Sequence, residues 1–491
     1  MASKPDKAQV LIIGGGPGGS YSAACLAREG VDVVILESAR FPRYHIGESM
    51  LPSIRNFLRY IDLEDTFVAH GFYKKKGAAF RLHSSKPEGY TNFVALDENN
   101  YAWNTVRSES DEIMLSHAAT CGAMVFQETR VTDIEFDAGG QRPVAALWKD
   151  SQNRSGRIQF NYLIDASGRR GLLSTKYFGT RQPIQSLKNI AMWSYWCDTG
   201  TYKPDSERAG SPFFEALGDG SGWAWFIPLH GNKTSVGVVM KSEIWSKNKS
   251  TFPSQNSLLE FYLAALKGAP EVKSLIGAGG MINITPNGGT PVVMTASDYS
   301  YSASSYAGEN YRIVGDAGAF VDPFFSNGIH LAVSGGLSAA ATICASIKGD
   351  CSEAEAAHFH TRRIGTSYTR FLVVVLSAYQ QMRAQSSPVL ADIDEDSFDR
   401  AFNHFRPIIQ GYADVQSDSV KCALTEEELK ATLEFCAQAY IPPEPENKSA
   451  KAQVNLVGIM ATSETLDALS RASIDGRRIR LDQGALGLES F

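Results

Sequence analysis

The sequence lacks the features of a disulfide framework, a structural zinc motif or a membrane anchor. Its seven cysteines are scattered without C-x-x-C spacing, which indicates reduced and mostly buried thiols. No apolar run reaches membrane-spanning length, and the apolar stretch near the N-terminus breaks into glycines, unlike a signal peptide. An excess of positive charge is absent too, since the formal net charge is −6, so we expect neither nucleic acid nor a membrane as a partner. These absences predict a soluble, cytoplasmic protein.

The composition is otherwise that of a globular protein. The chain has 491 residues, of which 43% are hydrophobic and 20% charged. A chain of this length can bury a large core without disulfide or metal support, and no metal site is predicted.

The first forty residues contain a complete strand–turn–helix–strand unit. An apolar run, 10–13, leads into the G-x-G-x-x-G turn 14–19, a helical stretch follows over 20–28, and a second strand ends at Glu37. In such a unit the glycines allow a tight turn, a close approach to a pyrophosphate and close helix packing. The helix N-terminus binds phosphate, and the acid accepts from a ribose hydroxyl. The unit predicts a dinucleotide site formed by Gly14, Gly16, Pro17, Gly19, Ser20 and Glu37.

Two later segments each read as a short strand followed by a polar glycine turn. One strand ends at Asp165, and the other, 311–314, ends in Gly-Asp at Asp316. The second segment continues through Ser-Asn-Gly into an apolar helix, 329–347. The glycines at 277–280 lead into a strand instead of a helix, so the sequence holds no second complete dinucleotide unit, and no separate nicotinamide domain is expected.

The stretch W-A-W-F-I-P-L, residues 223–229, precedes a glycine-containing turn and a second apolar strand, which predicts a hairpin. Strand alternation places Trp223, Trp225 and Ile227 on one face, and Pro228 marks an edge or a strand end. For W-x-W alone, ordinary core packing is the plainer interpretation.

The glycine unit, the Gly-Asp turn and W-x-W-x-I-P together resemble the flavin-dependent halogenases, of the phenolic, fungal-polyketide type, within the para-hydroxybenzoate-hydroxylase-like FAD superfamily. The resemblance spans about residues 8 to 345. It implies an α/β fold in which an FAD-binding Rossmann-like domain carries an inserted antiparallel β-sheet substrate region and is followed by a C-terminal helical region. The FAD parts would be about 8–50, 100–180 and 300–350, and the substrate sheet about 70–100 and 185–300. Together they form a module of 1–350, followed by a mainly helical, substrate-side region, 351–491, with helices over 352–383 and 425–440.

The resemblance also implies further cofactor contacts. The R-x-x-x-G-E-S segment supplies Arg43 and Ser49, whereas Glu48 is a weaker candidate because an acid there could simply satisfy backbone donors. Arg107 resembles an arginine that approaches the FAD, although Asp111 four residues on also permits a surface ion pair. The remaining expected contacts are Val131, Asp165, Asp316, Gly328 and Ile329.

The run K-K-K-G-A resembles the K-x-G-A segment that carries the catalytic lysine of the family. Lys75 matches that spacing, and Lys74 is the alternative because three consecutive lysines leave the register open. An ammonium could hydrogen-bond to hypohalous acid, and a neutral amine could form a haloamine, a route that burial would favour by lowering the pKa. A solvated basic turn is the other interpretation of the run.

The resemblance assigns two further roles. Trp223, Trp225, Ile227 and Pro228 would form a wall that keeps the flavin from the substrate and lets only hypohalous acid pass. Ser326, Asn327 and Gly328 would bind the halide through backbone N–H groups at the start of the apolar helix. A simple helix cap is the other interpretation, and the two are compatible.

The implied enzyme takes FAD as FADH2 from a separate flavin reductase, with O2 and chloride or bromide, and halogenates a phenolic small molecule. A flavin monooxygenase or a geranylgeranyl-reductase-like oxidoreductase shares the glycine unit but not the tryptophan motif plus lysine. A binding scaffold of the Rab-escort type is a non-enzymatic alternative. The general base is unassigned, with His330 among the choices, and no oligomeric state is predicted.

Overall fold

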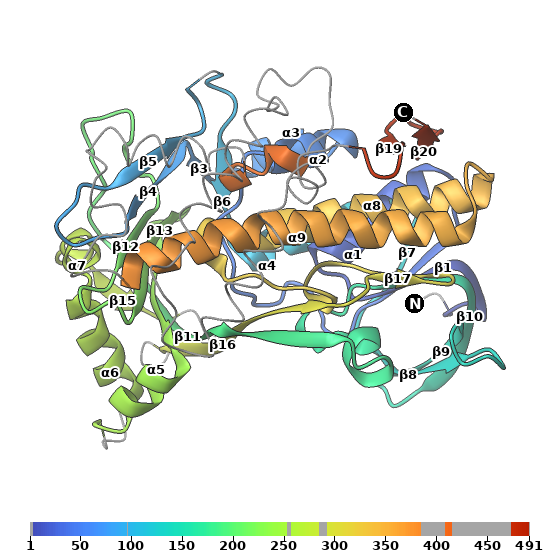
Figure 1. Ribbon diagram of the computed structural model, residues 1–491, viewed down its shortest axis with the longest axis horizontal. Coiled ribbons are helices and arrows are strands. Elements are labelled where there is room, and N and C mark those ends of the chain that lie inside the picture. Colours follow the sequence, from blue (N-terminus) through green and yellow to red (C-terminus); the bar gives the residue numbers. More distant parts are fainter. Residues whose placement is uncertain are drawn as a thin grey trace, which may run out of the picture.

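The computed structural model describes residues 3–95, 97–252, 257–283, 292–383, 408–414 and 473–490. It contains two large sheets, and a long helix runs from one sheet to the other (Figure 1). The first sheet has the order β17-β18-β10-β1-β2-β7, and all of these neighbours pair in parallel except β17 and β18, while β9 and β8 continue antiparallel from β10. The bounds are β1 (Lys7–Ile13), β2 (Val33–Leu36), β7 (Met124–Phe126), β8 (Thr129–Phe136), β9 (Pro143–Asp150), β10 (Ser155–Asp165), β17 (Ala307–Gly308) and β18 (Tyr311–Ile313).

The parallel strands are buried because helices cover them. The predicted helix over 20–28 is confirmed as α1 (Pro17–Arg28), and the apolar helix over 329–347 is confirmed as α8 (Gly328–Lys348). These two helices approach closely where a Cβ on Gly336 would lie 2.8 Å from Gly18 O. By length and composition α8 could cross a membrane, but 83% of its most apolar window is buried, which is typical of a core helix.

The second sheet is antiparallel except for the pairing of β12 with β4. Its order is β15-β11-β14-β13-β12-β4-β5, and β16 also pairs with β11. The predicted tryptophan hairpin is confirmed as β13 and β14. The bounds are β4 (Gly77–Arg81), β5 (Gly89–Asn92), β11 (Arg181–Cys197), β12 (Phe213–Ala216), β13 (Gly222–Leu229), β14 (Lys233–Lys241), β15 (Gly280–Ile282) and β16 (Met294–Ala303).

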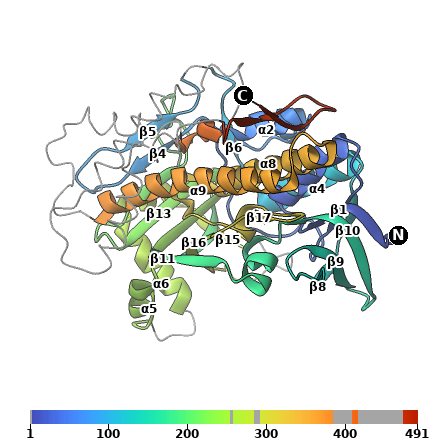
Figure 2. The same cartoon turned by 45° about the vertical axis from the view of Figure 1, so that its right-hand side comes forward.

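Helices cover both faces of this antiparallel sheet. Phe226 and Val238 pack with Tyr262 and Val272, which belong to α6 (Ser257–Ala265) and α7 (Pro270–Ile276), and α5 (Ser242–Lys249) lies next to α6. On the other face lies α9 (Glu353–Arg383), which runs along α8 and continues over the sheet (Figures 1 and 2). Strand alternation therefore gives β13 one face toward α6 and α7 and the other toward α9.

Several shorter helices and strands lie outside the two large sheets. They are α2 (Ile54–Tyr60), α3 (Glu64–His70), α4 (Arg107–Thr120), and the two-stranded sheet of β3 (Tyr73–Lys75) and β6 (Ala102–Asn104). In this sheet Lys74 pairs with Trp103 and Lys75 pairs with Ala102.

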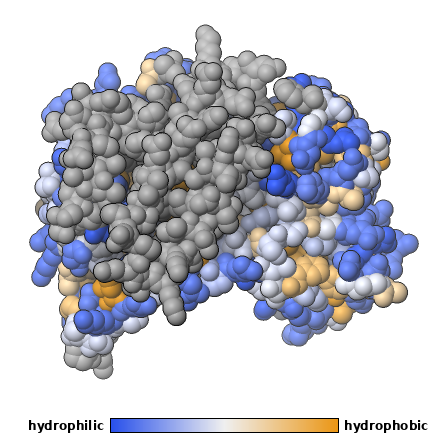
Figure 3. Space-filling model, in the orientation of Figure 1, coloured by the Kyte–Doolittle hydropathy of each residue, from blue (hydrophilic) through white to orange (hydrophobic). Residues whose placement is uncertain are grey.

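The expected α/β class, with a parallel Rossmann-type sheet and an antiparallel one, is confirmed, and α9 confirms the helix expected over 352–383. The helix expected over 425–440 lies outside the described residues. The C-terminal region also contains a hairpin that was not predicted, β19 (Arg477–Arg480) and β20 (Gly487–Ser490), which lies against α8, where Lys348 Nζ donates to Leu486 O at 3.1 Å. In Figure 3 the right-hand margin over β9 and β10 is predominantly hydrophilic, in agreement with the alternating exposure along the first half of β10.

Gly237 explains how the indoles fit onto the antiparallel sheet. It lies in β14 between two tryptophans, because it pairs with Trp193 of β11 on one side and with Trp225 of β13 on the other. A Cβ at Gly237 would overlap the Trp225 ring and would lie 2.7 Å from Trp193 Cβ. The missing side chain therefore makes room for the indole of Trp225.

Gly237→Ala should destabilise the protein by about 1–3 kcal/mol, because the added methyl group forces the indoles out of their packed positions. Gly280→Ala is the matched control, since it also adds a methyl group to a strand of this sheet but would meet nothing within 4 Å. Denaturant unfolding of both variants measures the difference, and equal losses of stability would contradict the packing described here.

Candidate active site

The glycine loop joins β1 to α1 at the carboxyl end of the parallel sheet. Gly14 has φ +100°, and a Cβ there would overlap Ala166 O. A Cβ on Gly19 would overlap Gly14 O, so packing inside the protein already requires these two glycines. A Cβ on Gly16 would meet nothing closer than Arg43 Nη2, at 3.5 Å. Open space therefore remains beside Gly16, where a pyrophosphate would approach the backbone.

The start of α1 presents N–H groups beside this space. Gly16 is the N-cap and makes no side-chain cap, and Pro17 follows it at the first helical position. Ser20 Oγ donates to Gly15 O at 2.8 Å and so does not cap the helix either. The helix dipole and these N–H groups favour a bound anion.

Glu37 lies at the end of β2 and holds the glycine loop. Its carboxylate accepts from Gly15 N and from Ala39 N, each at 2.6 Å. A carboxylate has about four acceptor sites, so the expected bond from a ribose hydroxyl remains possible beside these two.

Arg107 and Arg43 share the carboxylate of Asp111. Arg107 donates through Nε and Nη2 at 2.9 and 3.0 Å, and Arg43 donates through Nη1 at 3.0 Å. Arg107 is 6% exposed and Asp111 1%, so the surface ion pair considered from the sequence is wrong. Burial would raise the pKa of the Asp111 carboxyl, but Arg107 holds that pKa below its ordinary value.

Two aspartates stand at the ends of parallel strands. Asp165 shapes its own turn, because its carboxylate accepts from Ser167 N at 3.1 Å and from Leu173 N at 2.7 Å. Asp316 as a whole residue is only partly buried, and desolvation raises the pKa of its carboxyl although Arg169 and Arg107 act in the opposite direction. The structure thus places this carboxyl group close enough to arginines for their charge to act on it.

Val131 lies farther along the same sheet. It belongs to β8, is 2% exposed, and its carbonyl accepts from Arg170 Nη1 at 3.1 Å. Its backbone is the part of the residue that could face a cofactor.

The residues around the glycine loop fit FAD. The space beside Gly16 and the uncapped start of α1 suit a pyrophosphate, and Arg43 supplies a cation beside them. The carboxyl of Asp316, a partly buried residue, offers an acceptor for a hydroxylated chain.

Three of the tryptophans of the antiparallel sheet, Trp193, Trp223 and Trp225, form one cluster. Trp223 and Trp225 have ring centroids 5.8 Å apart, and Trp225 and Trp193 are 6.4 Å apart. Trp223 Nε1 donates to Tyr379 OH at 2.8 Å, and Trp225 Nε1 donates to Ser235 Oγ at 3.0 Å. The expectation that Trp223, Trp225 and Ile227 share a face is confirmed, because all three belong to the core beneath α9.

The loop before α8 lies directly against this cluster. Phe324 packs edge-on against Trp223, with ring centroids 5.0 Å apart. Ser326 has φ +57°, and Asn327 Nδ2 donates to Asp322 O at 3.0 Å without capping the helix. The interpretation of this loop as a simple helix cap formed by the Asn327 side chain is therefore wrong.

The first turn of α8 combines an open and a packed residue. A Cβ on Gly328 would meet nothing within 4 Å, so the helix N-terminus borders open space. Ile329 is 5% exposed and packs into the core beside Met50 and Ile54. Only the first of these residues is placed to face an anion.

Residues 43–50, hereafter the hub segment, connect the glycine loop to the tryptophans. Tyr195 OH donates to Glu48, and Trp193 Nε1 donates to Tyr44 OH at 2.7 Å. Burial raises the pKa of Glu48 to about 7, against the hydrogen bonds that stabilise its charged form. Glu48 is thus hydrogen-bonded to strand β11, a contact that was not expected from the sequence.

The end of the hub segment reaches both β13 and the lysines. Ser49 Oγ donates to Asn104 Oδ1 at 3.0 Å, and Asn104 Nδ2 donates to Pro228 O at 2.9 Å. Lys75 Nζ donates to Met50 O at 2.9 Å. The lysine and the end of the tryptophan motif are therefore joined through neighbouring residues of one segment.

The two candidate lysines differ in environment. Lys75 is 1% exposed, and burial lowers its pKa to about 7. Its Nζ lies 5.1 Å from the centre of the Phe93 ring. Lys74 is exposed and lies over Tyr101. The interpretation of the lysine run as a solvated basic turn is thus wrong for Lys75.

Several residues of this site were not identified from the sequence. Trp193, Tyr195 and Asn104 lie outside the motifs, although the W-S-Y-W alternation of β11 could have indicated a second aromatic strand. His330 is fully occupied, because Nδ1 bonds Ser53 Oγ and Nε2 bonds Asp414 Oδ2, each at 2.9 Å. These bonds and an exposure of 2% argue against its use as a general base.

Comparison with a family model described as tryptophan halogenase gives a match over residues 9–96 and 93–422. Curated fungal proteins match over most of the chain. Flavin-dependent halogenase armH1 of Armillaria mellea is 48% identical over 96% of this chain and 91% of that protein. Flavin-dependent halogenase ascD of Acremonium egyptiacum is 50% identical over 92% and 82%. Sulochrin halogenase gedL of Aspergillus terreus is 44% identical over 99% and 94%.

Solved structures show the same fold. The myxobacterial chondrochloren halogenase CndH has a TM-score of 0.70 and 26% identity, covering 91% of this chain and 99% of that chain. Flavin-dependent brominase Bmp2 has a TM-score of 0.69 and 23% identity over 88% and 100%. Halogenase PltM, in complex with phloroglucinol and FAD, has a TM-score of 0.67 and 17% identity over 94% and 99%.

Gly16→Val should remove tightly bound FAD while leaving the fold intact. The added Cβ meets only the end of Arg43, but the side chain occupies the space beside the backbone, and overpacking of ~1–3 kcal/mol corresponds to a loss of affinity of about 5- to 150-fold. Absorbance of the purified protein measures bound FAD, and thermal unfolding without FAD tests the fold. Gly19→Ala provides the contrast, since its Cβ overlaps Gly14 O and should lower stability itself. A yellow Gly16→Val protein with normal FAD content would contradict this assignment.

The buried Lys75 should make stability depend on pH. Its pKa is about 7 in the folded protein and 10.5 ordinarily, so between these values the unfolded chain binds more protons and stability rises with pH. Compared with Lys75→Met, the wild type should gain about 1.4 kcal/mol per pH unit over this window and show a constant difference below it. Denaturant unfolding from pH 5 to 9 measures both proteins. The free energy of unfolding of Lys74→Met should change with pH as that of the wild type does. If the free energy of unfolding of Lys75→Met also changed with pH in parallel with the wild type, the burial of the ammonium group would be contradicted.

Proposed function

The chain belongs to the flavin-dependent halogenases, and from this premise we propose that it uses FADH2, O2 and chloride or bromide to halogenate a phenolic, polyketide-like small molecule. Family membership makes it an enzyme and an oxidoreductase. It also disfavours the hydroxylase, the reductase and the non-enzymatic scaffold that share the dinucleotide unit.

One observation carries the finer proposal: Lys75 is buried, has a pKa of about 7 and is bonded to the hub segment. The same segment contacts the Asp111 carboxylate through Arg43 at one end and reaches Pro228 through Ser49 and Asn104 at the other. A cationic side chain is rarely buried without a role, so its position between the two regions supports a catalytic function.

In the proposal, the parallel sheet holds the cofactor. Gly16 and the start of α1 contact the pyrophosphate, Glu37 the ribose, and Asp316 the hydroxylated chain, and Arg43, Ser49 and Arg107 lie along the remainder. The flavin supplies the electrons that reduce O2 and allow a halide to become hypohalous acid. The corresponding parts of the chain are about 8–50, 100–180 and 300–350.

The halide would bind at the start of α8. Of the three expected residues, Asn327 and Gly328 would offer backbone N–H groups there, whereas Ser326 N donates to Pro323 O at 2.8 Å. No side chain caps the helix, and a Cβ on Gly328 would meet open space. The dipole of a 21-residue helix also favours an anion at this end.

The tryptophan cluster would separate the halide site from the substrate. Trp223 packs on Phe324, next to the halide loop, while Trp225, Ile227 and Pro228 continue along β13 toward Asn104. In this arrangement the packed indoles would exclude an aromatic ring, and only a small oxidant such as hypohalous acid would reach the other side. The antiparallel sheet, about 70–100 and 185–300, would then line the substrate side together with the region from residue 351.

Lys75 would direct the oxidant to the ring. With a pKa of about 7, its ammonium and its neutral amine are both populated near neutral pH. The ammonium can donate a hydrogen bond to hypohalous acid, and the amine can form a haloamine. Either form delivers the halogen from one fixed position, as a regioselective reaction requires.

The proposed substrate is a phenol, which is an electron-rich ring. The sulochrin halogenase among the relatives and the PltM complex with phloroglucinol support such a substrate. A separate flavin reductase would supply FADH2, since the sequence holds no second dinucleotide unit. We also propose the cytoplasm as the compartment of the reaction.

The test combines the protein with FAD, a flavin reductase, NADH, bromide and a panel of phenols, and product masses are measured. Bromine isotope doublets are expected for the wild type and for Lys74→Met. Lys75→Met should lose at least about 99% of the halogenated product, as expected when a positioned catalytic group is removed, while peroxide still forms from reduced flavin. A hydroxylated product without halogen would indicate a monooxygenase. Undiminished bromination by Lys75→Met would remove the lysine from the mechanism.

A further inference from the structure

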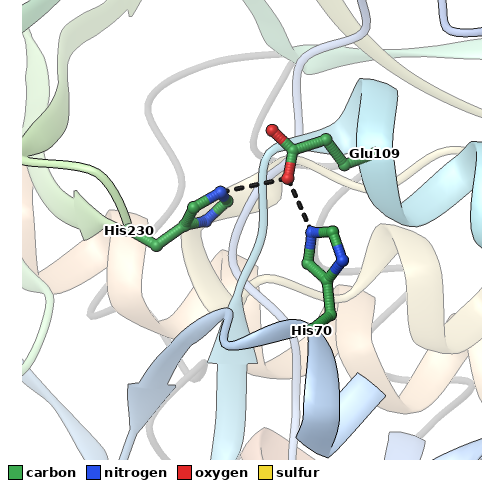
Figure 4. A group of neighbouring side chains, drawn as sticks. All are labelled: His70, Glu109 and His230. Atoms are coloured by element: carbon green, nitrogen blue, oxygen red, sulfur yellow. Dashed lines mark hydrogen bonds and ion pairs between the residues drawn. The ribbon is translucent and has the colours of Figure 1, made fainter. Parts of the chain in front are cut away.

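Two histidines and a glutamate meet at the surface, beside the site but outside the proposed chemistry. His70 is the last residue of α3, Glu109 lies in the first turn of α4, and His230 follows β13 in the turn to β14. Glu109 Oε2 is 2.7 Å from His70 Nε2 and 3.0 Å from His230 Nε2 (Figure 4). The three ligand atoms all lie within 4.8 Å of one another.

The geometry brings all three donor atoms toward one point. In Figure 4 both imidazoles direct a nitrogen at the same carboxylate oxygen. Ligand atoms of a tetrahedral Zn²⁺ site are about 3.3 Å apart, given Zn–N and Zn–O bonds of about 2.0–2.2 Å. The observed separations from the Glu109 oxygen, 2.7 and 3.0 Å, therefore need to lengthen by about 0.3–0.6 Å to match these bond lengths.

The side chains have room for that adjustment. The side chains of His70, Glu109 and His230 are 32%, 34% and 25% exposed. An ion can thus enter from solvent, and water can complete its coordination. The ring of Phe72 packs against both imidazoles, and its centroid lies 4.2 Å from that of His70 and 5.5 Å from that of His230.

The surroundings of His230 indicate an exchangeable site. Its Nδ1 is buried and has no hydrogen-bond partner among the described residues. The imidazole ligands of tight metal sites usually donate their second N–H to an acceptor, and loss of that bond weakens metal binding by about 10–100-fold. Partial exposure acts in the same direction.

We propose that His70, Glu109 and His230 bind one divalent transition-metal ion, with Zn²⁺ as the best match to two imidazoles and a carboxylate. The ion would connect three segments that carry the active-site residues. The strand of Lys75 begins three residues after His70, the tryptophan strand ends at the residue before His230, and Glu109 is two residues from Arg107. Metal binding would hold these segments in their folded arrangement.

Binding of Zn²⁺ to the full-length, tag-free and chelator-treated protein tests this proposal without any activity assay, so its outcome does not depend on the halogenase function. Calorimetry should give one ion per chain. The melting temperature should rise by roughly 2–4 °C at a hundredfold excess over Kd, because the ion binds only the folded state. Co²⁺ should show the visible absorption of a nitrogen- and oxygen-ligated ion without a thiolate charge-transfer band.

Three variants and one control identify the ligands. His70→Ala, His230→Ala and Glu109→Gln should each weaken Zn²⁺ binding at least about tenfold. Glu109→Gln keeps the shape of the side chain and so guards against a general loss of fold. His358→Ala is the control, because His358 bonds Asp475 at 3.0 Å in an exposed pair of similar chemistry elsewhere. Absence of Zn²⁺ binding to the wild type, or equal affinity in the three variants, would overturn the proposal.

Discussion

The buried guanidinium of Arg107 is the interaction on which the arrangement of the site depends. It donates to both oxygens of Asp111, and its remaining Nη1 donates to the carbonyls of Ile46 and Gly47 at 2.9 and 3.1 Å. A buried charge is tolerated only when it is paired and its hydrogen bonds are made, and here α4 supplies the counter-ion while the hub segment supplies the acceptors. Because Arg43 shares the same carboxylate, this cluster of charges fixes the position of the hub segment relative to α4.

The hub segment in turn joins regions that are distant in sequence. Thr105 N donates to Glu48 O at 2.8 Å, Asn104 bonds Ser49, and Lys75 bonds Met50 O. The partners of the hub segment in these bonds are Lys75 of β3, Asn104 of β6 and Thr105, the residue after β6. The lysine therefore cannot move independently of the backbone beside the proposed flavin site, and Asn104 extends the same coupling to Pro228 of the tryptophan strand. One short segment therefore contacts both the proposed nucleotide site and residues next to the antiparallel sheet, and so holds the two regions near each other.

The sequence predicted the elements with strong local patterns and missed the contacts between them. The glycine unit, the Gly-Asp turn and the tryptophan hairpin each have a periodicity or a spacing that can be read along the chain, and each was found where expected. The choice between Lys74 and Lys75 could not be read in this way. Their burial depends on the pairing of β3 with β6, almost thirty residues farther on. Gly237 is likewise conspicuous only when Trp193 and Trp225 are placed on both sides of it.

Lys75 and Glu48 show why burial and function are linked here. Desolvation lowers the pKa of the lysine and raises that of the acid, and both arrive at about 7 from opposite sides. An ammonium has three donors, yet the one acceptor found for Lys75 among the described residues is Met50 O, so the folded protein stabilises the charged form only partly. A hydrophobic residue of similar length would satisfy this pocket at lower cost in folding free energy. The retained cost is understandable if the lysine must change its proton or its hydrogen-bond partner during the reaction, because a fully solvated or fully paired ammonium would be held in one state.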